Sequence, residues 1–307
     1  MPLDPSHPDY WTEVLQFTSI VHRDVYPAID TTNEKIRGIA HDKVVLVTGA
    51  GSGFGEGACL QWARAGARAI VLAARNQERI THVATNLRDI APAVKTLAVR
   101  TDVSSEKDVD NLFTEAVNSF GQVDVVIHAA GVLGPVVELK EAPVDEWWRA
   151  FEINTKGTFL IARALARVSH SREATFIQTG TAASYFASPG QSSYTAAKAA
   201  GNMLVDQLHA EYSTIRVFNV HPGMSKSPVL RKELEVYAKD TPELFGSLTI
   251  YLSGKHADFL RGRFIVANWD VQDLENHEDE IVTQGLLKSQ PFKGDIGPGG
   301  HWKTSTE

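Results

Sequence analysis

The residues of this chain best suited to chemistry are a tyrosine and a lysine four positions apart, Tyr194 and Lys198 in the segment YTAAK. Four residues make about one helical turn, so both side chains project from the same face of a helix. A lysine ammonium near a phenol stabilises the phenolate and lowers the tyrosine pKa. Such a tyrosine can donate or accept a proton near neutral pH. The pair therefore predicts proton transfer to or from a substrate oxygen.

A glycine-rich turn, TGAGSGFG at residues 48–55, follows an apolar run and precedes a helical pattern. Gly49, Gly53 and Gly55 let the backbone turn sharply and approach a pyrophosphate, which the amides at a helix N-terminus can bind. The spacing is Gly-x-x-x-Gly-x-Gly, and taken alone it is also compatible with a tight turn that binds nothing. Together with the tyrosine–lysine pair, the turn predicts hydride transfer between a dinucleotide and a carbonyl carbon.

The elements that must position these residues alternate between strands and helices. We expect strands at 44–48, 67–74, 94–100, 123–129, 174–179, 215–220 and 261–267, and helices at 53–65, 76–90, 104–120, 143–168 (with one possible break) and 191–212. This alternation predicts an α/β fold with one doubly wound parallel sheet of the Rossmann type.

The chain divides into three parts around that sheet. Residues 43–267 form the predicted dinucleotide-binding and catalytic domain. Residues 1–42 precede it as an extension packed on the core, with a helix expected at 9–21. Residues 268–307 are polar, with glycines near their end, and we expect a surface tail.

Composition narrows the class of protein. The 307 residues are 43% hydrophobic and 22% charged, as in ordinary soluble domains, and the net charge of −7 does not favour nucleic acid or an anionic membrane as partner. No apolar run is long enough to span a membrane, and the first residues lack the pattern of a signal peptide. The single cysteine, Cys59, excludes an intramolecular disulfide. A cytoplasmic location is therefore expected.

Five motifs in order give the chain a family resemblance. TGAGSGFG, HAAG (128–131), FEINTKGTF (151–159), YTAAK and HPGMSKS (221–227) resemble the motifs of short-chain dehydrogenases/reductases over about residues 42–267. The first 42 residues and the Trp269-Asp270 pair resemble, more faintly, a fungal branch of this family that is often met in secondary metabolism.

The resemblance implies a catalytic group and a cofactor site. The catalytic group would be Asn154, Thr181, Tyr194 and Lys198. The cofactor would contact Thr48, Gly49, Gly51, Ser52, Gly53, Phe54, Gly55, Arg75, Asp102, Val103, Ala129, Ala130, Gly131, Tyr194, Lys198, Pro222, Gly223, Ser225 and Ser227. Tyr194 would donate the proton, Thr181 would hydrogen-bond the same oxygen, Lys198 would hold the nicotinamide ribose, and Asn154 would position a water near the lysine.

Two of these positions depart from the family pattern. The spacings from Tyr194 and from Asn154 both place the family's serine at Thr181, whose hydroxyl can still hydrogen-bond a substrate oxygen; Thr179 and Ser184 are nearby substitutes. His128 replaces an asparagine that ties neighbouring strands together, and we expect it to be structural, with a proton relay as the alternative. His221 is expected at a strand end, without a catalytic role.

The end of the second strand indicates which nicotinamide is used. An acidic residue there would bind the adenosine ribose and repel a 2′-phosphate, but the sequence has Ala74 followed by Arg75. A guanidinium suits a phosphate, so NADP(H) is favoured over NAD. The alternatives are that Arg75 is a solvated loop residue, that Asn76 caps the next helix, and that Asp102 caps the helix expected at 104.

The expected substrate is a hydrophobic, oxygenated small molecule. Its walls would come from residues 132–137, from Tyr185 and Phe186, and from 224–245, which is also a candidate lid. We expect an NADP(H)-dependent ketone reductase or alcohol dehydrogenase. The alternatives are a non-redox isomerase, dehydratase or cyclase of the same fold, and a nucleotide-sensing protein without turnover. The eleven histidines lack metal-ligand spacing, so no metal is expected, and the family resemblance implies a homodimer or homotetramer.

Overall fold

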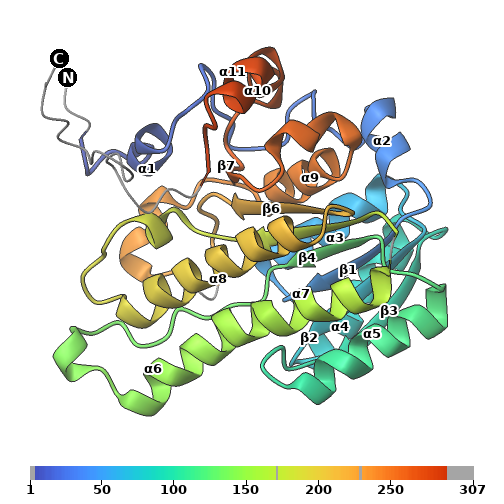
Figure 1. The fold of residues 1–307 in the computed structure, drawn as a ribbon, viewed down its shortest axis with the longest axis horizontal. Coiled ribbons are helices and arrows are strands. Elements are labelled where there is room, and N and C mark those ends of the chain that lie inside the picture. Colours follow the sequence, from blue (N-terminus) through green and yellow to red (C-terminus); the bar gives the residue numbers. More distant parts are fainter. Residues whose placement is uncertain (1–3, 171, 228–229, 289–307) are drawn as a thin grey trace, which may run out of the picture.

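A single parallel sheet of seven strands forms the centre of the molecule. The computed structural model describes residues 4–170, 172–227 and 230–288 (Figure 1). The strands are β1 (Val44–Thr48), β2 (Ala69–Ala74), β3 (Lys95–Arg100), β4 (Val125–His128), β5 (Ala174–Thr179), β6 (Ile215–His221) and β7 (Phe264–Val266). Their order in the sheet is β3-β2-β1-β4-β5-β6-β7, and every pair is parallel. The predicted doubly wound α/β sheet is confirmed.

Helices cover both faces of the sheet, which is why central strands such as β1 are buried along their whole length. The helices are α1 (Tyr10–Val14), α2 (Glu34–Ala40), α3 (Gly53–Arg64), α4 (Gln77–Ile90), α5 (Glu106–Phe120), α6 (Val144–Phe151), α7 (Gly157–Ser169), α8 (Ser192–Glu211), α9 (Pro242–Leu252), α10 (Val271–Asn276) and α11 (Glu278–Thr283). One core joins the sheet to α3, α4 and α9, and a second core joins it to α5, α7 and α8. In β1, Val45 and Val47 enter the first core, and Val44 and Leu46 enter the second.

The long helix expected at 143–168 contains an irregular turn. Residues Glu152–Lys156 form one π-helical turn between α6 and α7. Such a turn shifts the register of the side chains that follow it, and it is frequent at functional sites. Asn154 lies in this turn with its side chain buried.

The N-terminal segment packs on the first core. Its first helix, α1, is shorter than the one expected at 9–21. Tyr26, Ile29 and Ile36 are buried against α9 and its neighbours. Figure 1 shows this blue segment running beside the red C-terminal helices α10 and α11, and an antiparallel bridge joins Val21 to Trp269.

The expected surface tail is wrong for its first part. Trp269, Val271, Leu274 and Ile281 are buried in the first core, and α10 and α11 cover it. These four apolar residues lie among many charged ones, so the polar composition of the segment concealed a helical face that packs inward. The rest of the predicted tail, residues 289–307, lies outside the described residues.

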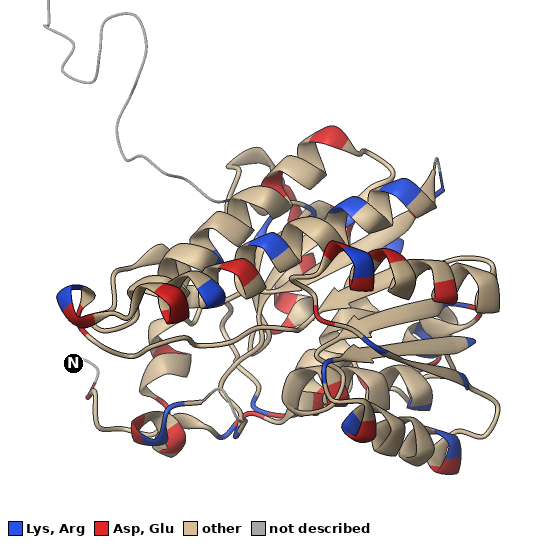
Figure 2. Cartoon of the chain, turned by 90° about the horizontal axis from the view of Figure 1, so that it is seen from below, with Lys and Arg blue, Asp and Glu red and all other residues tan. Residues whose placement is uncertain are grey.

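Charged residues of both signs are mixed over the elements (Figure 2). Among the described residues in this view, basic side chains are interspersed with acidic ones and are not gathered as on a surface that binds nucleic acid. Within the described ranges, no helix is both long and apolar enough to cross a membrane.

Candidate functional site

A cavity of about 1100 Å³ lies beyond the carboxyl ends of the strands. Its lining includes the turn after β1 and the residues that follow β4, where the strand order reverses. In an open α/β sheet, this switch point is where ligands bind.

The cavity brings together most of the residues predicted for the site. Those that line it are Gly49, Gly51, Ser52, Gly53, Phe54, Gly55, Arg75, Asp102, Val103, Ala129, Ala130, Gly131, Thr181, Tyr194, Lys198, Pro222, Gly223, Ser225 and Ser227. Thr48 and Asn154 are absent from this lining and lie buried behind it.

The glycine turn is shaped for close backbone approach. Gly49 has a φ of +68°, and a Cβ there would lie 2.8 Å from the Ala130 nitrogen. A Cβ on Gly55 would lie 2.3 Å from the Gly49 carbonyl oxygen, so neither position can carry a side chain without movement. Ser52, at the N-cap of α3, makes no side-chain hydrogen bond to that helix. The first amides of α3 are therefore left for an anion such as a pyrophosphate.

Two arginines stand beside the end of β2. Arg75 lines the cavity, is exposed, and has no ion pair among the described residues. Arg79, one helical turn later, also lines the cavity, and its side chain packs beside Gly51. Our reading of the sequence missed Arg79, although its spacing of four from Arg75 was a usable signal. Asn76 caps α4 by accepting a hydrogen bond from the Arg79 amide at 3.0 Å.

Asp102 is held from two sides at the cavity edge. Its carboxylate accepts hydrogen bonds from the Ser104 amide at 3.0 Å and hydroxyl at 2.6 Å, and it pairs with Arg149 at 2.8 Å. Partial burial acts to raise the pKa of Asp102, but these hydrogen bonds and the arginine charge outweigh it, and the net shift is downward. The N-cap of α5 is Ser105, so the alternative that Asp102 itself caps this helix is wrong.

Tyr194 and Thr181 line the same cavity wall. The Nζ atom of Lys198 lies 5.9 Å from the centroid of the Tyr194 ring and donates to the Thr179 carbonyl at 2.9 Å. Ser184 instead donates to the Thr181 carbonyl at 2.6 Å and does not line the cavity. Thr181 therefore shares the cavity with Tyr194, and Ser184 does not.

The pKa of Tyr194 is shifted opposite to the direction we expected. Burial raises it, and the hydrogen bond from Thr181 only partly offsets this. Burial also lowers the pKa of Lys198 to about 8, so the cation that should stabilise the phenolate is itself disfavoured. In the protein alone, Tyr194 is therefore a protonated phenol at neutral pH.

Asn154 fixes the backbone next to the lysine. Its side chain accepts from the Val132 amide at 3.0 Å and donates to the Val132 carbonyl at 2.8 Å. A Cβ on Gly131 would lie 2.9 Å from the Asn154 Oδ1 and 3.4 Å from the Lys198 Nζ. The π-helical turn thus brings Asn154 to the place where Gly131 and Lys198 meet.

Two buried histidines lie near this group. The Nδ1 of His128 is 2.8 Å from the Thr48 hydroxyl, so the side chain joins β4 to β1 as the structural interpretation expects. Burial, helped by the Lys198 charge, lowers the pKa of His128 to about 3. His221 lines the cavity and accepts from the Ala182 amide at 3.4 Å, and burial lowers its pKa to about 4. Both rings are neutral at physiological pH.

The apolar end of the cavity agrees only in part with the expected walls. Val132, Leu133, Phe186, Met224, Leu230 and Leu234 line it. Tyr185 does not, because its ring packs edge-on against Phe264 at 4.8 Å. The end of the predicted lid is also wrong, since Leu244 and Phe245 are buried in α9, and Pro228 lies outside the described residues.

Two lining residues come from a part of the chain that we did not connect with the site. Trp11 and Leu15, at the N-terminal segment, line the same cavity as the glycine turn. Nothing local in the sequence could have placed them there, because Phe186, which Trp11 stacks on, and Trp269, which donates to the Leu15 carbonyl, both lie more than 150 positions later. Among the residues that the structure describes, no group of three or more His, Cys, Asp or Glu side chains could hold a metal ion.

Comparisons with known proteins agree with this geometry. The family model for short chain dehydrogenases matches residues 43–237. The chain is 31% identical to the short chain dehydrogenase pigC of Monascus ruber, over 88% of this chain and 92% of the relative, and 30% identical to citE of the same species, over 88% and 94%. A solved short chain dehydrogenase from Shigella flexneri, complexed with NADP, is 25% identical with a TM-score of 0.69, over 74% of this chain and 97% of that one.

Proposed function

The chain belongs to the short chain dehydrogenase family, and on that premise we propose that it is an NADP(H)-dependent reductase that interconverts a ketone and a secondary alcohol. One observation carries the proposal: Tyr194, Thr181 and the buried Lys198 line the same cavity as a glycine turn where a Cβ would clash with the backbone. Proton donor and dinucleotide site therefore open on one space.

The residues present fit a nicotinamide dinucleotide. The glycine turn and the uncapped amides of α3 would hold the pyrophosphate, and the segments 102–103 and 129–131 would line the adenosine and ribose. Pro222 and Gly223 would face the nicotinamide. Arg75 and Arg79, with Ala74 in place of an acid, favour the 2′-phosphate of NADP(H) over NAD, and the relative complexed with NADP supports this choice.

The chain's own residues would supply the proton and hold the oxygen. A bound NADPH supplies the hydride that the carbonyl carbon receives. The carbonyl oxygen then takes the proton of the Tyr194 hydroxyl while Thr181 donates a hydrogen bond to it, and the product is the alcohol. Lys198 would hold the ribose and favour the tyrosinate left behind, and Asn154 would keep Gly131 and Val132 in place. Because burial keeps Tyr194 protonated, the arrangement is ready for carbonyl reduction.

The substrate we propose is a hydrophobic, oxygenated ketone of secondary metabolism. The apolar residues that line the cavity, such as Val132, Leu133 and Leu234, and the similarity to the fungal relatives support this class. A non-redox step by the same fold is the second candidate, because Thr181 and His128 depart from the family pattern. A cytoplasmic location belongs to the proposal as well, since the single cysteine forms no internal disulfide.

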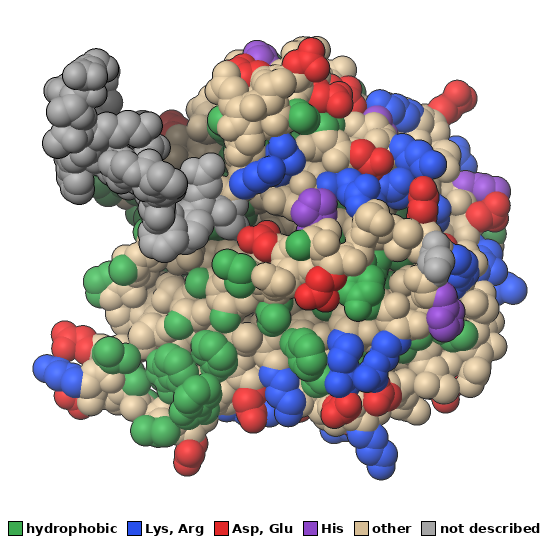
Figure 3. Space-filling model, in the orientation of Figure 1, with side chains coloured by type: hydrophobic (Ala, Val, Ile, Leu, Met, Phe, Trp, Pro, Cys, Tyr) green, Lys and Arg blue, Asp and Glu red, His purple; other side chains and the backbone are tan. Residues whose placement is uncertain are grey.

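We also propose that the enzyme is a homodimer or homotetramer. Leu139, Val144, Trp148, Phe159 and Met203 are exposed on or beside α6, α7 and α8. Figure 3 shows green side chains gathered over the outer end of α6. An exposed apolar face of this kind is typical of a surface covered by another protein chain. Sedimentation of the purified protein would give its oligomeric state.

The deciding experiment follows the loss of NADPH absorbance with a panel of cyclic and aromatic ketones and identifies the product. We expect stoichiometric NADPH consumption and alcohol formation, with NADPH preferred to NADH. Conversion of a substrate without net consumption of the reduced cofactor would favour the non-redox candidate, and failure to bind NADP(H) at all would overturn the proposal.

A further inference from the structure

The N-terminal segment supplies an aromatic wall to the cavity. Trp11 lines it together with Phe186, and the two rings are parallel within 2° with centroids 6.2 Å apart. Leu15, one turn later, lines the same end. The family model begins only at residue 43, so Trp11 and Leu15 lie outside the part that it matches, and Phe186 lies inside it.

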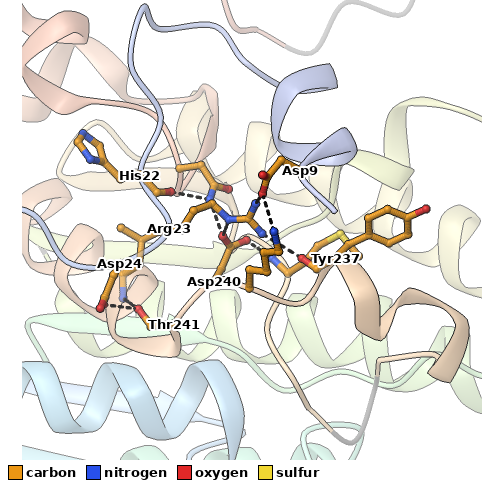
Figure 4. Close-up of polar contacts among 11 residues, drawn as sticks. Asp9, His22, Arg23, Asp24, Tyr237, Asp240 and Thr241 are labelled. Carbon is orange, nitrogen blue, oxygen red and sulfur yellow. Dashed lines mark hydrogen bonds and ion pairs between the residues drawn. The ribbon is translucent and has the colours of Figure 1, made fainter. Parts of the chain in front are cut away.

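A network of charges fixes the wall in place. Arg23 pairs with Asp9, two residues before Trp11, and with Asp240, and it donates to the Tyr237 carbonyl at 3.0 Å. Figure 4 shows the guanidinium between these partners. We call Asp9, Arg23 and Asp240 the clamp. It ties the segment that carries Trp11 to the segment after β6.

The clamp also reaches the loop that faces the proposed nicotinamide position. The carboxylate of Asp240 accepts from the Met224 amide, and a Cβ on Gly223 would lie 2.5 Å from its Oδ2. At the other end of α1, the Trp269 indole donates to the Leu15 carbonyl at 2.7 Å. Trp11 is thus held between two anchored points and is a fixed wall of the cavity.

The aromatic rings of Trp11 and Phe186 favour a ligand with a flat ring. Phe186 is 43% exposed and lines the cavity, to which Leu15, Leu230 and Leu234 contribute aliphatic side chains. Parallel aromatic faces gain most from a flat, unsaturated ring that stacks on them, and a puckered saturated ring cannot make that contact. Arg231 also lines the cavity, and its charge is paired with Glu233 at 3.5 Å.

We infer that Trp11 is a specificity-determining residue, and that with Phe186 it makes the enzyme prefer ketones fused to a flat aromatic ring over saturated ketones of the same skeleton. This inference rests on the proposed function for the identity of the reacting group, the ketone. The stacking itself affects ketone affinity, which can be measured without any reaction taking place.

The test compares two ketones with one carbon skeleton, 1-tetralone and trans-1-decalone, which differ in whether one ring is aromatic. Their dissociation constants are measured by calorimetry with the NADP⁺-loaded enzyme, in which reduction cannot proceed. The variants are Trp11→Leu, which removes the flat ring, and Trp11→Phe, which keeps one. The matched control is Phe17→Leu, an exposed aromatic residue of the same segment that does not line the cavity.

The wild-type protein and Phe17→Leu should bind 1-tetralone more tightly than 1-decalone. Trp11→Leu should weaken 1-tetralone about three- to ten-fold and change 1-decalone less than two-fold, and Trp11→Phe should restore most of the preference. NADPH affinity should be equal in all four proteins, which shows that each is folded.

Equal losses for both ketones, or no wild-type preference, would overturn the inference while leaving the proposed reductase intact. Selective loss of 1-tetralone binding in a protein that oxidises no NADPH with any ketone would support the aromatic wall and count against the proposed reaction instead.

Discussion

The two ends of the cavity are built by different means. At the cofactor end, the shape comes from the backbone: Gly49 and Gly55 allow contacts that a Cβ would block, and the helix α3 presents its amides. At the substrate end, the shape comes from side chains of segments far apart in the sequence, which the clamp holds together. The difference suggests that the first end serves a fixed ligand, and that the second end can be changed without disturbing the first.

The largest effect is expected where the two ends meet, at Tyr194, the proposed proton donor. Tyr194→Phe should lower kcat about 10²- to 10⁴-fold, the usual contribution of a general acid, with NADPH affinity unchanged. Tyr212→Phe, at the C-cap of the same helix, is the control. Steady-state kinetics and NADPH titration measure both quantities. A Tyr194→Phe variant with full turnover would remove the proposed acid.

The second-largest effect is expected on the stability of the protein, when the clamp at the substrate end is broken. Arg23→Gln leaves the buried Asp240 without its ion pair, and we expect a loss of about 2–3 kcal/mol in the free energy of unfolding. Burial already raises the pKa of Asp240, so its charge depends on these partners. Urea unfolding measures the loss, with the exposed Arg37→Gln as control. If ketone affinity were unchanged in the variant, the clamp would not support the substrate wall.

Lowering the pH should reduce the stability of the protein through His128, which lies in β4 of the sheet. The folded pKa of His128 is about 3, below its ordinary value of 6.5, so the histidine favours folding above pH 6.5 and this advantage is lost as the pH falls toward 3. Between pH 7 and pH 5 the wild type should lose about 2 kcal/mol more stability than His128→Asn. Urea unfolding at both pH values tests this, and His41→Asn, at an exposed histidine, should behave as the wild type. Parallel pH profiles for all three proteins would contradict the assignment.

The smallest effect is expected for cofactor choice. Arg75→Asp should shift the ratio of kcat/KM for NADPH over NADH about ten-fold or more toward NADH, because a carboxylate repels the 2′-phosphate. Arg88→Asp, at the far end of α4, should leave the ratio unchanged. The discrimination between 1-tetralone and 1-decalone should be the same in both variants. An unchanged cofactor ratio would count against the role of Arg75.

The same contrast explains what the sequence could predict. The continuous apolar run VVLVT and the glycines after it are local signals, so β1 and the turn after it could be predicted from them. Trp11 could not be placed, because its contact with Phe186 depends on the clamp and on the folded position of two loops. The buried face of 268–281 was missed because four apolar residues are spread among acidic ones, and the pKa direction of Tyr194 depends on burial that no spacing reveals.

The interlocking of the two chain ends has a consequence for the order of assembly. Asn268 donates to the His22 carbonyl, and the Ser19 amide donates to Asp273, 254 residues later. During synthesis, residues 19–22 must therefore wait until about 250 further residues have been made before they find these partners. The wall that this segment carries is completed only after the glycine turn and the strands of the sheet have been synthesised.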